Sequence, residues 1–434
     1  MTLHSDQASR RLRAHPSSVS AARGIVRDAL TVARRDDLIE AAQLLVSEVV
    51  TNALVHAGTP IDFRASVGVA GLRVEVTDGS TQTPVPRRYG AMAGTGRGLR
   101  LLDQLVDRWG ALVHADGKTV WFELSSGARF GHVEGVPGTA EAENRPGGSR
   151  DDIVDVVLLN VPLLLLAAWH QHAEELLREH LLASLDADDD TEALKMHAAA
   201  SGAMSLLHEH IPAPDIGDDP GGLMATAVEP NVSAERLVLP VPSGSIPQFR
   251  VLDETLESAR ALAESGVFLT PPTQPELRAL RRWLCGQVVR ADRGEPPTPW
   301  SSDTETAPPP AVQPISWDDD VVTASNVALI AADDTDQVVA VSRPACDLLG
   351  YPDADHLLGR RLVAIIPPRY HQAHLAGFTL HLVNGRSPLL GRPVTVPILR
   401  HDDSEIVVEL LVTTQQMPGG RHLFVAEMRP LPQE

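Results

Sequence analysis

The sequence predicts a multidomain α+β protein with an N-terminal α/β sandwich, a central mostly helical module and a C-terminal α+β domain. The chain has 434 residues, enough for two to four domains. Two stretches rich in Gly, Pro and small polar or acidic residues, 127–150 and 294–315, are interpreted as linkers. The hydrophobic pattern differs among the parts they separate, 18–126, 151–293 and 316–430.

Composition narrows the functional classes. The formal net charge of −20 argues against nonspecific binding to nucleic acid or to anionic membranes. Cys285 and Cys346 are the only cysteines, which excludes a disulfide framework and a cysteine zinc site. Residues 1–16 lack the apolar core of a signal peptide, and the apolar run 153–169 is interrupted by polar residues. We therefore expect a cytoplasmic protein without membrane or nucleic-acid contacts.

The first domain is predicted from alternating helix and strand patterns. After a flexible lead, 1–17, a helix capped by Ser18 or Ser20 is expected to run to Arg34, and Asp36-Asp37 to cap a second helix that ends near His56. Period-two alternation predicts antiparallel strands at 61–67 and 71–77. A second hairpin, 110–115 with 119–125, turns at Asp116-Gly117. Together these elements predict helices on one face of a mixed sheet.

The second helix carries a polar stripe on an otherwise apolar surface. Glu48, Asn52 and His56 recur at every fourth position and share one face. A buried carboxylate beside a buried amide requires a partner. The stripe is either a helix edge wetted by solvent or a face turned toward a polar ligand with a hard cation such as Mg²⁺.

Two further segments favour the ligand. The strand 71–77 ends in Asp78-Gly79-Ser80. Gly94, Gly96 and Gly98 then open an amphipathic helix, where backbone N–H groups can approach an anion. This glycine triad does not follow a strand directly, so it does not fit the dinucleotide-binding pattern.

The three segments, in this order, resemble the Bergerat-fold (GHKL) ATPases, and within them the anti-sigma-factor serine kinases of the sporulation and stress type. The resemblance implies that Asn52 ligates Mg²⁺ and that Glu48 acts as general base. It also implies that Asp78, beside Gly79, reads the adenine amino group of ATP, and that the three glycines cradle the phosphates. Ser80 and Gln82 replace two glycines of the family pattern.

The central part, 151–293, carries no recognisable chemistry. We expect a short strand at 156–161 and helices at 163–185, 191–211, 254–265 and 275–290. The interpretation as a dimerisation element and the interpretation as a signal-relay element both remain open.

Residues 316–430 resemble a PAS sensor domain. Short strands at 327–331 and 338–341 flank an acidic turn, short helices and a helix at 370–383 follow, and three strands near 393–400, 405–413 and 421–428 complete the domain. The likeness is carried by Gly350-Tyr351, by the run 359–362 and by Arg400, Asp402 and Glu405. The fold does not name its ligand.

His374 lies on the expected helix of this domain at a spacing to Pro388 and Gly391 that resembles the haem-ligating histidine of bacterial oxygen-sensor PAS domains. Leu380 and Val394 stand where those sensors have basic residues. We therefore expect a colourless protein, with the PAS pocket empty or holding a small organic ligand.

These observations predict an ATP-binding bacterial signalling regulator, an anti-sigma-factor kinase that phosphorylates serine and is coupled to a PAS sensor. By the same resemblance, the expected partner is a sigma factor and/or an anti-anti-sigma (STAS) protein, and the chain is expected to form a homodimer. The alternative is a non-catalytic partner-switching scaffold that responds to nucleotide. A sensor histidine kinase is disfavoured, because such kinases place a phosphoacceptor helix before the ATPase module, and the lead 1–17 is too short for one.

Overall fold

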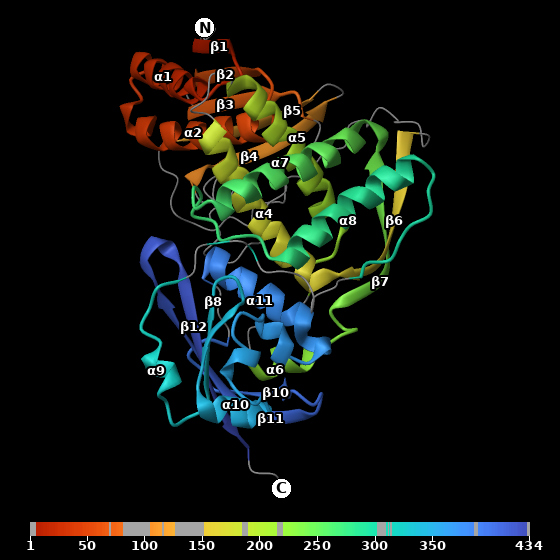
Figure 1. The fold of residues 1–434 in the computed structure, drawn as a ribbon. Helices are drawn as coiled ribbons and strands as arrows, with labels where there is room; N and C mark the ends of the chain where they lie inside the picture. Colours follow the sequence, from red (N-terminus) through yellow and green to blue (C-terminus); the bar gives the residue numbers. More distant parts are fainter. Residues whose placement is uncertain are drawn as a thin grey trace. The chain divides into compact units, whose positions relative to one another are not determined.

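A computed structural model describes most of the chain (Figure 1). The described residues are 6–68, 71–80, 105–114, 117–125, 152–184, 190–214, 220–301, 310, 312, 315–385 and 389–431. They divide into two compact units. One contains residues 1–154, 180–207 and 242–255, and the other contains 155–179, 208–241 and 256–434.

A five-stranded sheet forms one layer of the α/β sandwich in the first unit. Its strands are β1 (Asp6–Leu12), β2 (Ile61–Gly68), β3 (Gly71–Asp78), β4 (Arg108–His114) and β5 (Gly117–Leu124), in the spatial order β1-β2-β3-β5-β4. Every pairing is antiparallel, so the expectation of a mixed sheet is wrong. The predicted hairpins are confirmed, because strict alternation of apolar residues fixes which face each strand buries.

Helices cover one face of this sheet, as predicted (Figure 1). They are α1 (Ser17–Val32) and α2 (Ile39–Ala57), preceded by the 3-10 turn Asp36–Leu38. Their apolar sides pack on Phe63, Val74 and Phe122 in a continuous core. The opposite sheet face is polar: Arg73 stacks on Trp121 with 4.4 Å from its Cζ to the ring centroid and pairs with Glu75 and Glu123.

Helix α2 together with its preceding turn, Asp36–Val55, is long and apolar enough to cross a membrane, with a mean hydropathy of 1.5. Its apolar residues, among them Leu45, Val46 and Val50, are buried in the core of the sandwich. The apolar character is thus explained by packing between α1 and the sheet.

Two expectations for the N-terminal segment are wrong. Part of the expected flexible lead is strand β1, which pairs with β2 from Asp6↔Val67 to Leu12↔Ile61. The sequence of β1 is polar and shows no alternating apolar pattern, so it did not predict a strand. This edge strand buries one large apolar side chain, Leu12. The expected caps are also absent: neither α1 nor α2 has a side-chain hydrogen bond at its N-cap position.

The central segment contains the four expected helices, together with a short helix and a strand that were not expected. The elements are β6 (Ile153–Pro162), α4 (Leu163–Ser184), α5 (Asp190–His210), α6 (Pro220–Thr226), β7 (Ser233–Pro242), α7 (Ile246–Glu264) and α8 (Pro275–Asp292). Strand β7 pairs with β6 in a two-stranded sheet. Pro240 and Pro242 obscured it, because proline is tolerated at the edges of a sheet and rarely inside one.

The segment after α8 is bound to the helix rather than extended. Thr298 accepts a hydrogen bond from Gln287 Nε2 at 2.7 Å and donates its amide to Gln287 Oε1 at 3.0 Å. Its carbonyl accepts from Trp283 Nε1 at 2.9 Å. The first residues of the expected linker 294–315 therefore belong to the packed structure, whereas 302–309, 311 and 313–314 lie outside the described residues, as does 127–150.

A second five-stranded antiparallel sheet lies in the C-terminal region. Its strands are β8 (Leu329–Asp333), β9 (Val338–Val341), β10 (Val394–Leu399), β11 (Glu405–Gln416) and β12 (His422–Pro430), in the order β10-β11-β12-β8-β9. Between β9 and β10 come α10 (Arg343–Leu349), three 3-10 turns and α11 (His371–Asn384), and α9 (Asp320–Thr323) precedes β8. This is the predicted sequence of two strands, short helices and a three-strand meander.

Candidate functional site

The carboxyl ends of α2 and β3 meet at one end of the sandwich. Gly58 ends α2 in the left-handed conformation at φ 60°, with its N–H bonded to Leu54 O. Thr59 follows at once, and its Oγ1 accepts the amide of Gly79 at 2.9 Å. Since α2 rises about 1.5 Å per residue, Asn52 lies about 8 Å along the helix from Ala57. Asn52 therefore lies toward the end of the domain that holds Asp78, and Glu48 lies about 6 Å farther back along the helix.

Asp78 is a carboxylate on the helix-covered face of the sheet, in the row of Leu72, Val74 and Val76. It is 3% exposed. Its Oδ1 accepts the Lys118 ammonium at 3.0 Å and the Ser80 amide at 2.8 Å. Its Oδ2 is buried and has no hydrogen-bond partner among the described residues. Burial raises the pKa of the Asp78 carboxyl, while Lys118 and the Ser80 amide oppose that rise.

Glu48 and Asn52 lie on the edge of the buried side of α2. Both side chains are half-buried, beside the fully buried Val49, Val50 and Ala53. This position is compatible with either interpretation of the stripe. The side chain of His56 and the residues Gly94, Gly96 and Gly98 lie outside what the structure describes.

The described residues fit an adenine nucleotide at this end of the sandwich. Asp78 Oδ2 is a buried acceptor with no partner in the part of the chain that the structure describes, and an exocyclic amino group needs such an acceptor. The amide oxygen of Asn52 and the carboxylate of Glu48 are hard ligands of the kind that Mg²⁺ prefers. Gly79, expected to bind cofactor, donates its amide to Thr59 and so joins the two elements.

An open groove of about 560 Å³ lies elsewhere on this domain, between α1 and the first turns of α2. Arg23, Asp36 and Leu44 are among its lining residues, and none of Glu48, Asn52 and Asp78 is. The groove is therefore separate from the candidate nucleotide site.

His374 is bound by a carboxylate of its own domain. Its Nε2 lies 2.7 Å from Oδ1 of Asp336, which is fully buried. To coordinate a haem iron, His374 Nε2 would have to give up its contact with Asp336. The geometry therefore does not favour the haem interpretation. The aromatic neighbour of the imidazole is Phe378, with ring centroids 5.9 Å apart.

The acidic turn 333–336 is buried instead of solvated. Arg361 pairs with Glu276 of α8 through two hydrogen bonds, at 2.6 and 3.1 Å, and lies 3.4 Å from Asp336 Oδ2. Arg421 pairs with Asp334 in the same turn. Buried charges persist where they are matched in this way.

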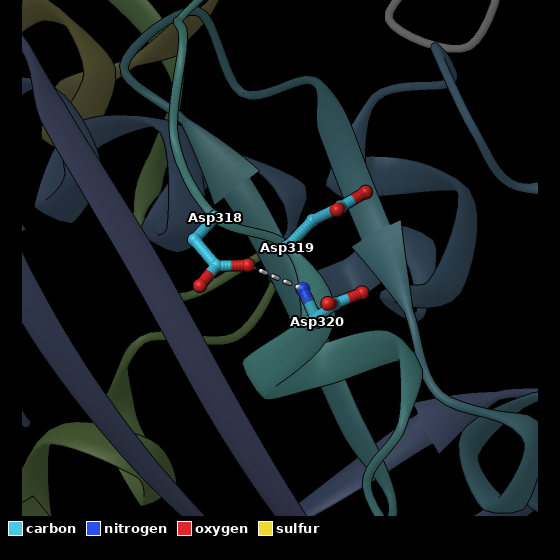
Figure 2. A group of neighbouring side chains, drawn as sticks. All are labelled: Asp318, Asp319 and Asp320. Atoms are coloured by element: carbon cyan, nitrogen blue, oxygen red, sulfur yellow. Dashed lines mark hydrogen bonds between the residues drawn. The ribbon is translucent and has the colours of Figure 1, made fainter.

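Three consecutive aspartates, Asp318, Asp319 and Asp320, bring carboxylate oxygens within 4.8 Å of one another (Figure 2). All three are exposed. Asp318 Oδ1 accepts the amide of Asp320 at 3.2 Å, at the start of α9. This local turn explains the arrangement, and we assign no metal to it.

Sequence reasoning missed Lys118, Thr59 and the pair Glu276–Arg361. One signal pointed to Lys118: only two of the 37 basic residues are lysines. The other partners are far apart along the chain, so no local pattern marks them.

Solved PAS and LOV structures match about a quarter of the chain, at low identity and low overall structural similarity. A PAS domain of an HTR-like protein from Haloarcula marismortui is 20% identical, covers 26% of this chain and 88% of its own, and has a TM-score of 0.21. The LOV protein of Rhodobacter sphaeroides is 19% identical over 27% of this chain and 66% of its own, with a TM-score of 0.22.

Sequence comparisons identify the N-terminal domain. An uncharacterized protein of Azorhizobium caulinodans is 34% identical over 105 residues, which is 24% of this chain and 14% of that protein. The chain thus matches only a small part of that relative. Residues 12–124 match the family model of the histidine kinase-like ATPase domain. The sandwich that contains the candidate nucleotide site is therefore similar to the histidine kinase-like ATPase domain over residues 12–124.

Proposed function

We propose that the chain is an ATP-dependent regulator of the anti-sigma-factor type, a cytoplasmic serine kinase whose activity responds to its PAS-like domain. The observation that carries the proposal is the buried Oδ2 of Asp78, which has no hydrogen-bond partner among the described residues. It lies at the end of the sandwich where β3 meets the end of α2, the helix of Glu48 and Asn52. The match of residues 12–124 to an ATPase domain supports it.

Each residue has a role in this proposal. Asp78 accepts a hydrogen bond from the adenine amino group, and Asn52 holds Mg²⁺. The bound metal supplies neutralisation of phosphate charge. Glu48 accepts the hydroxyl proton of the substrate serine. The serine oxygen bonds to the γ-phosphorus of ATP as ADP leaves. The glycines 94, 96 and 98 are proposed to enclose the phosphates.

The proposed substrate is a STAS-type antagonist with a phosphorylatable serine, and the proposed second partner is a sigma factor. A homodimer is the proposed oligomeric state. The acidic net charge agrees with a protein partner rather than nucleic acid.

A second candidate is a partner-switching scaffold without catalysis. It is favoured by Ser80, which stands where the family has glycine and whose amide turns back onto Asp78 Oδ1 at 2.8 Å. In this version ATP occupancy alone changes the affinity for the partner.

Phosphotransfer separates the candidates. The full chain is incubated with Mg·ATP and a purified STAS protein, and phosphoserine is measured by mass spectrometry. The kinase proposal expects serine phosphate that is lost in Glu48→Gln and retained in Glu40→Gln, a control on the exposed first turn of α2. ATP binding without any phosphotransfer would favour the scaffold. Acid-labile phosphohistidine on the chain itself would indicate a sensor histidine kinase instead.

A further inference from the structure

Lys118 lies beside Asp78, the residue proposed to bind the nucleotide base. It lies directly across from Asp78 in the register of β3 with β5, and its side chain is 7% exposed. Both residues fall on the helix-covered face, in rows otherwise made of Val74, Val76, Val120 and Phe122. An ammonium in such a row is unfavourable unless it serves a buried partner.

The backbone holds the pair close together. Gly117 begins β5, and a Cβ added there would lie 2.0 Å from the carbonyl oxygen of Asp78. Only glycine allows this approach of the two strands. Lys118 therefore reaches Asp78 Oδ1 from the neighbouring strand, and together with the Ser80 amide it occupies that oxygen.

The remaining oxygen is left as a pure acceptor. An ionised carboxylate accepts through both oxygens, whereas a protonated carboxyl can also donate. Burial favours the protonated form of Asp78, and the Lys118 charge opposes it. With the lysine present, Oδ2 can accept from a 6-amino group but cannot pair with a 6-oxo group, which is itself an acceptor.

We propose that Lys118 is a positioning residue that makes the site selective for 6-aminopurine nucleotides over 6-oxopurine nucleotides, by holding Asp78 as an ionised acceptor. This inference rests on the proposed nucleotide-binding function of the same site. Lys118 does not act on the phosphates; it acts through Asp78.

Few other titratable groups surround the pair. On β2, Asp62 projects from the exposed sheet face. On α2, Glu48 is half-buried. On β4, the exposed His114 bonds to Thr119, which also lies on the exposed sheet face. Among the described residues, Lys118 is thus the cation that contacts Asp78.

The test compares Mg·ATP with Mg·ITP, which differ at the purine 6-position, by calorimetric titration of the full chain. The wild type is expected to prefer ATP by on the order of 10- to 100-fold, the range of one hydrogen bond to a charged group. Lys118→Met should reduce this preference toward unity at pH 6.5, with partial recovery as pH rises and Asp78 loses its proton. Lys118→Arg should keep the preference. Lys195→Met, which removes the other lysine at an exposed site, is the matched control.

A second measurement does not depend on a variant. Two lysines give two side-chain signals in a lysine-labelled sample, and Mg·ATP should shift the Lys118 signal but not that of Lys195. Wild type that binds ATP and ITP equally, or Lys118→Met that keeps the full preference and pH profile, would overturn the inference while leaving ATP binding intact. Wild type that binds neither nucleotide would overturn the proposed function, and this inference with it.

Discussion

Asp78 and Asp336 are both buried carboxylates, and they contact different basic side chains. Asp78 is held by Lys118 on the adjacent strand at 3.0 Å. Asp336 lies between His374 at 2.7 Å and Arg361 at 3.4 Å. Lys118 contacts only Oδ1 of Asp78, and Oδ2 has no partner among the described residues. Both oxygens of Asp336 have a basic side chain within ion-pairing distance, the His374 imidazole at Oδ1 and the Arg361 guanidinium at Oδ2. This difference favours a binding role for Asp78 and a structural role for Asp336.

Glu48 gives the residue-scale prediction. Glu48→Gln removes the proton acceptor but keeps the size of the side chain, so Mg·ATP affinity should stay within about threefold of wild type while phosphotransfer falls by 10²-fold or more, on the order of the contribution of a general base. Binding is followed by calorimetry and transfer by phosphoserine analysis. A parallel loss of binding and transfer would show that Glu48 is a ligand and not a base.

At this scale the sequence predicted the stripe but not its partners. Glu48 and Asn52 follow helical periodicity within one element, which is a local signal. Lys118 meets Asp78 only because two strands pair in a particular register, and that register depends on packing of the whole sheet.

His172 gives the prediction for a single helix. It is buried within α4, and its Nε2 donates to the carbonyl of Pro271 at 2.9 Å. Burial lowers the pKa of His172 to about 4. Below about pH 6.5, His172 is therefore protonated in the unfolded chain but stays neutral in the folded chain. Its contribution to the free energy of unfolding is complete above pH 6.5 and declines as pH falls toward 4, by about 3 kcal/mol.

His172→Gln keeps a donor for Pro271 and removes the titration. We expect its loss of stability between pH 6.5 and 4.5 to be smaller than that of wild type, measured by urea unfolding. His401→Gln, at an exposed position in the same unit, serves as the control substitution. An unchanged slope in His172→Gln would mean that other groups set the acid sensitivity.

At the scale of elements, the strength of the pattern decided which predictions held. Strands β2 and β3 alternate strictly, and α4 and α8 are long and amphipathic, so their existence was evident. Strand β1 has a polar sequence, pairs with β2 and buries Leu12 in the core. The expected caps at Ser18 or Ser20 and at Asp36-Asp37 are wrong, because these residues lie inside the helical turns and not before them.

For the whole molecule, the pair Glu276–Arg361 joins two segments that a sequence reader would assign to different domains. Arg361 precedes a turn of the C-terminal region, and Glu276 lies in the first turn of α8, both within one compact unit. Both side chains are almost completely buried, at 4% and 2% exposed. The contact makes cooperative unfolding of α8 and the C-terminal sheet the expected behaviour of this unit.

Arg361→Met should destabilise the unit by roughly 3–5 kcal/mol, because it leaves Glu276 and Asp336 without their cation. The double variant Arg361→Met with Glu276→Leu should lose less free energy of unfolding than the sum of the two single variants, by at least about 1 kcal/mol. The exposed pair Arg369–Glu405 is the control, and its removal should change stability by about 0–1 kcal/mol. Additive losses in the buried pair, measured by denaturant unfolding, would contradict this account.

The most direct test of the central claim is a calorimetric titration of Mg·ATP into the full chain, with and without the metal. We expect saturable, Mg²⁺-dependent binding at one site per chain. Asn52→Ala should abolish the Mg²⁺ dependence with a change in stability of about 1 kcal/mol or less, since the half-buried amide has no hydrogen-bond partner among the described residues. Thr51→Ala, at the exposed neighbouring position, should bind as wild type does. A folded wild type that binds no Mg·ATP, or a folded Asn52→Ala that binds it unchanged, would contradict the assignment of this site.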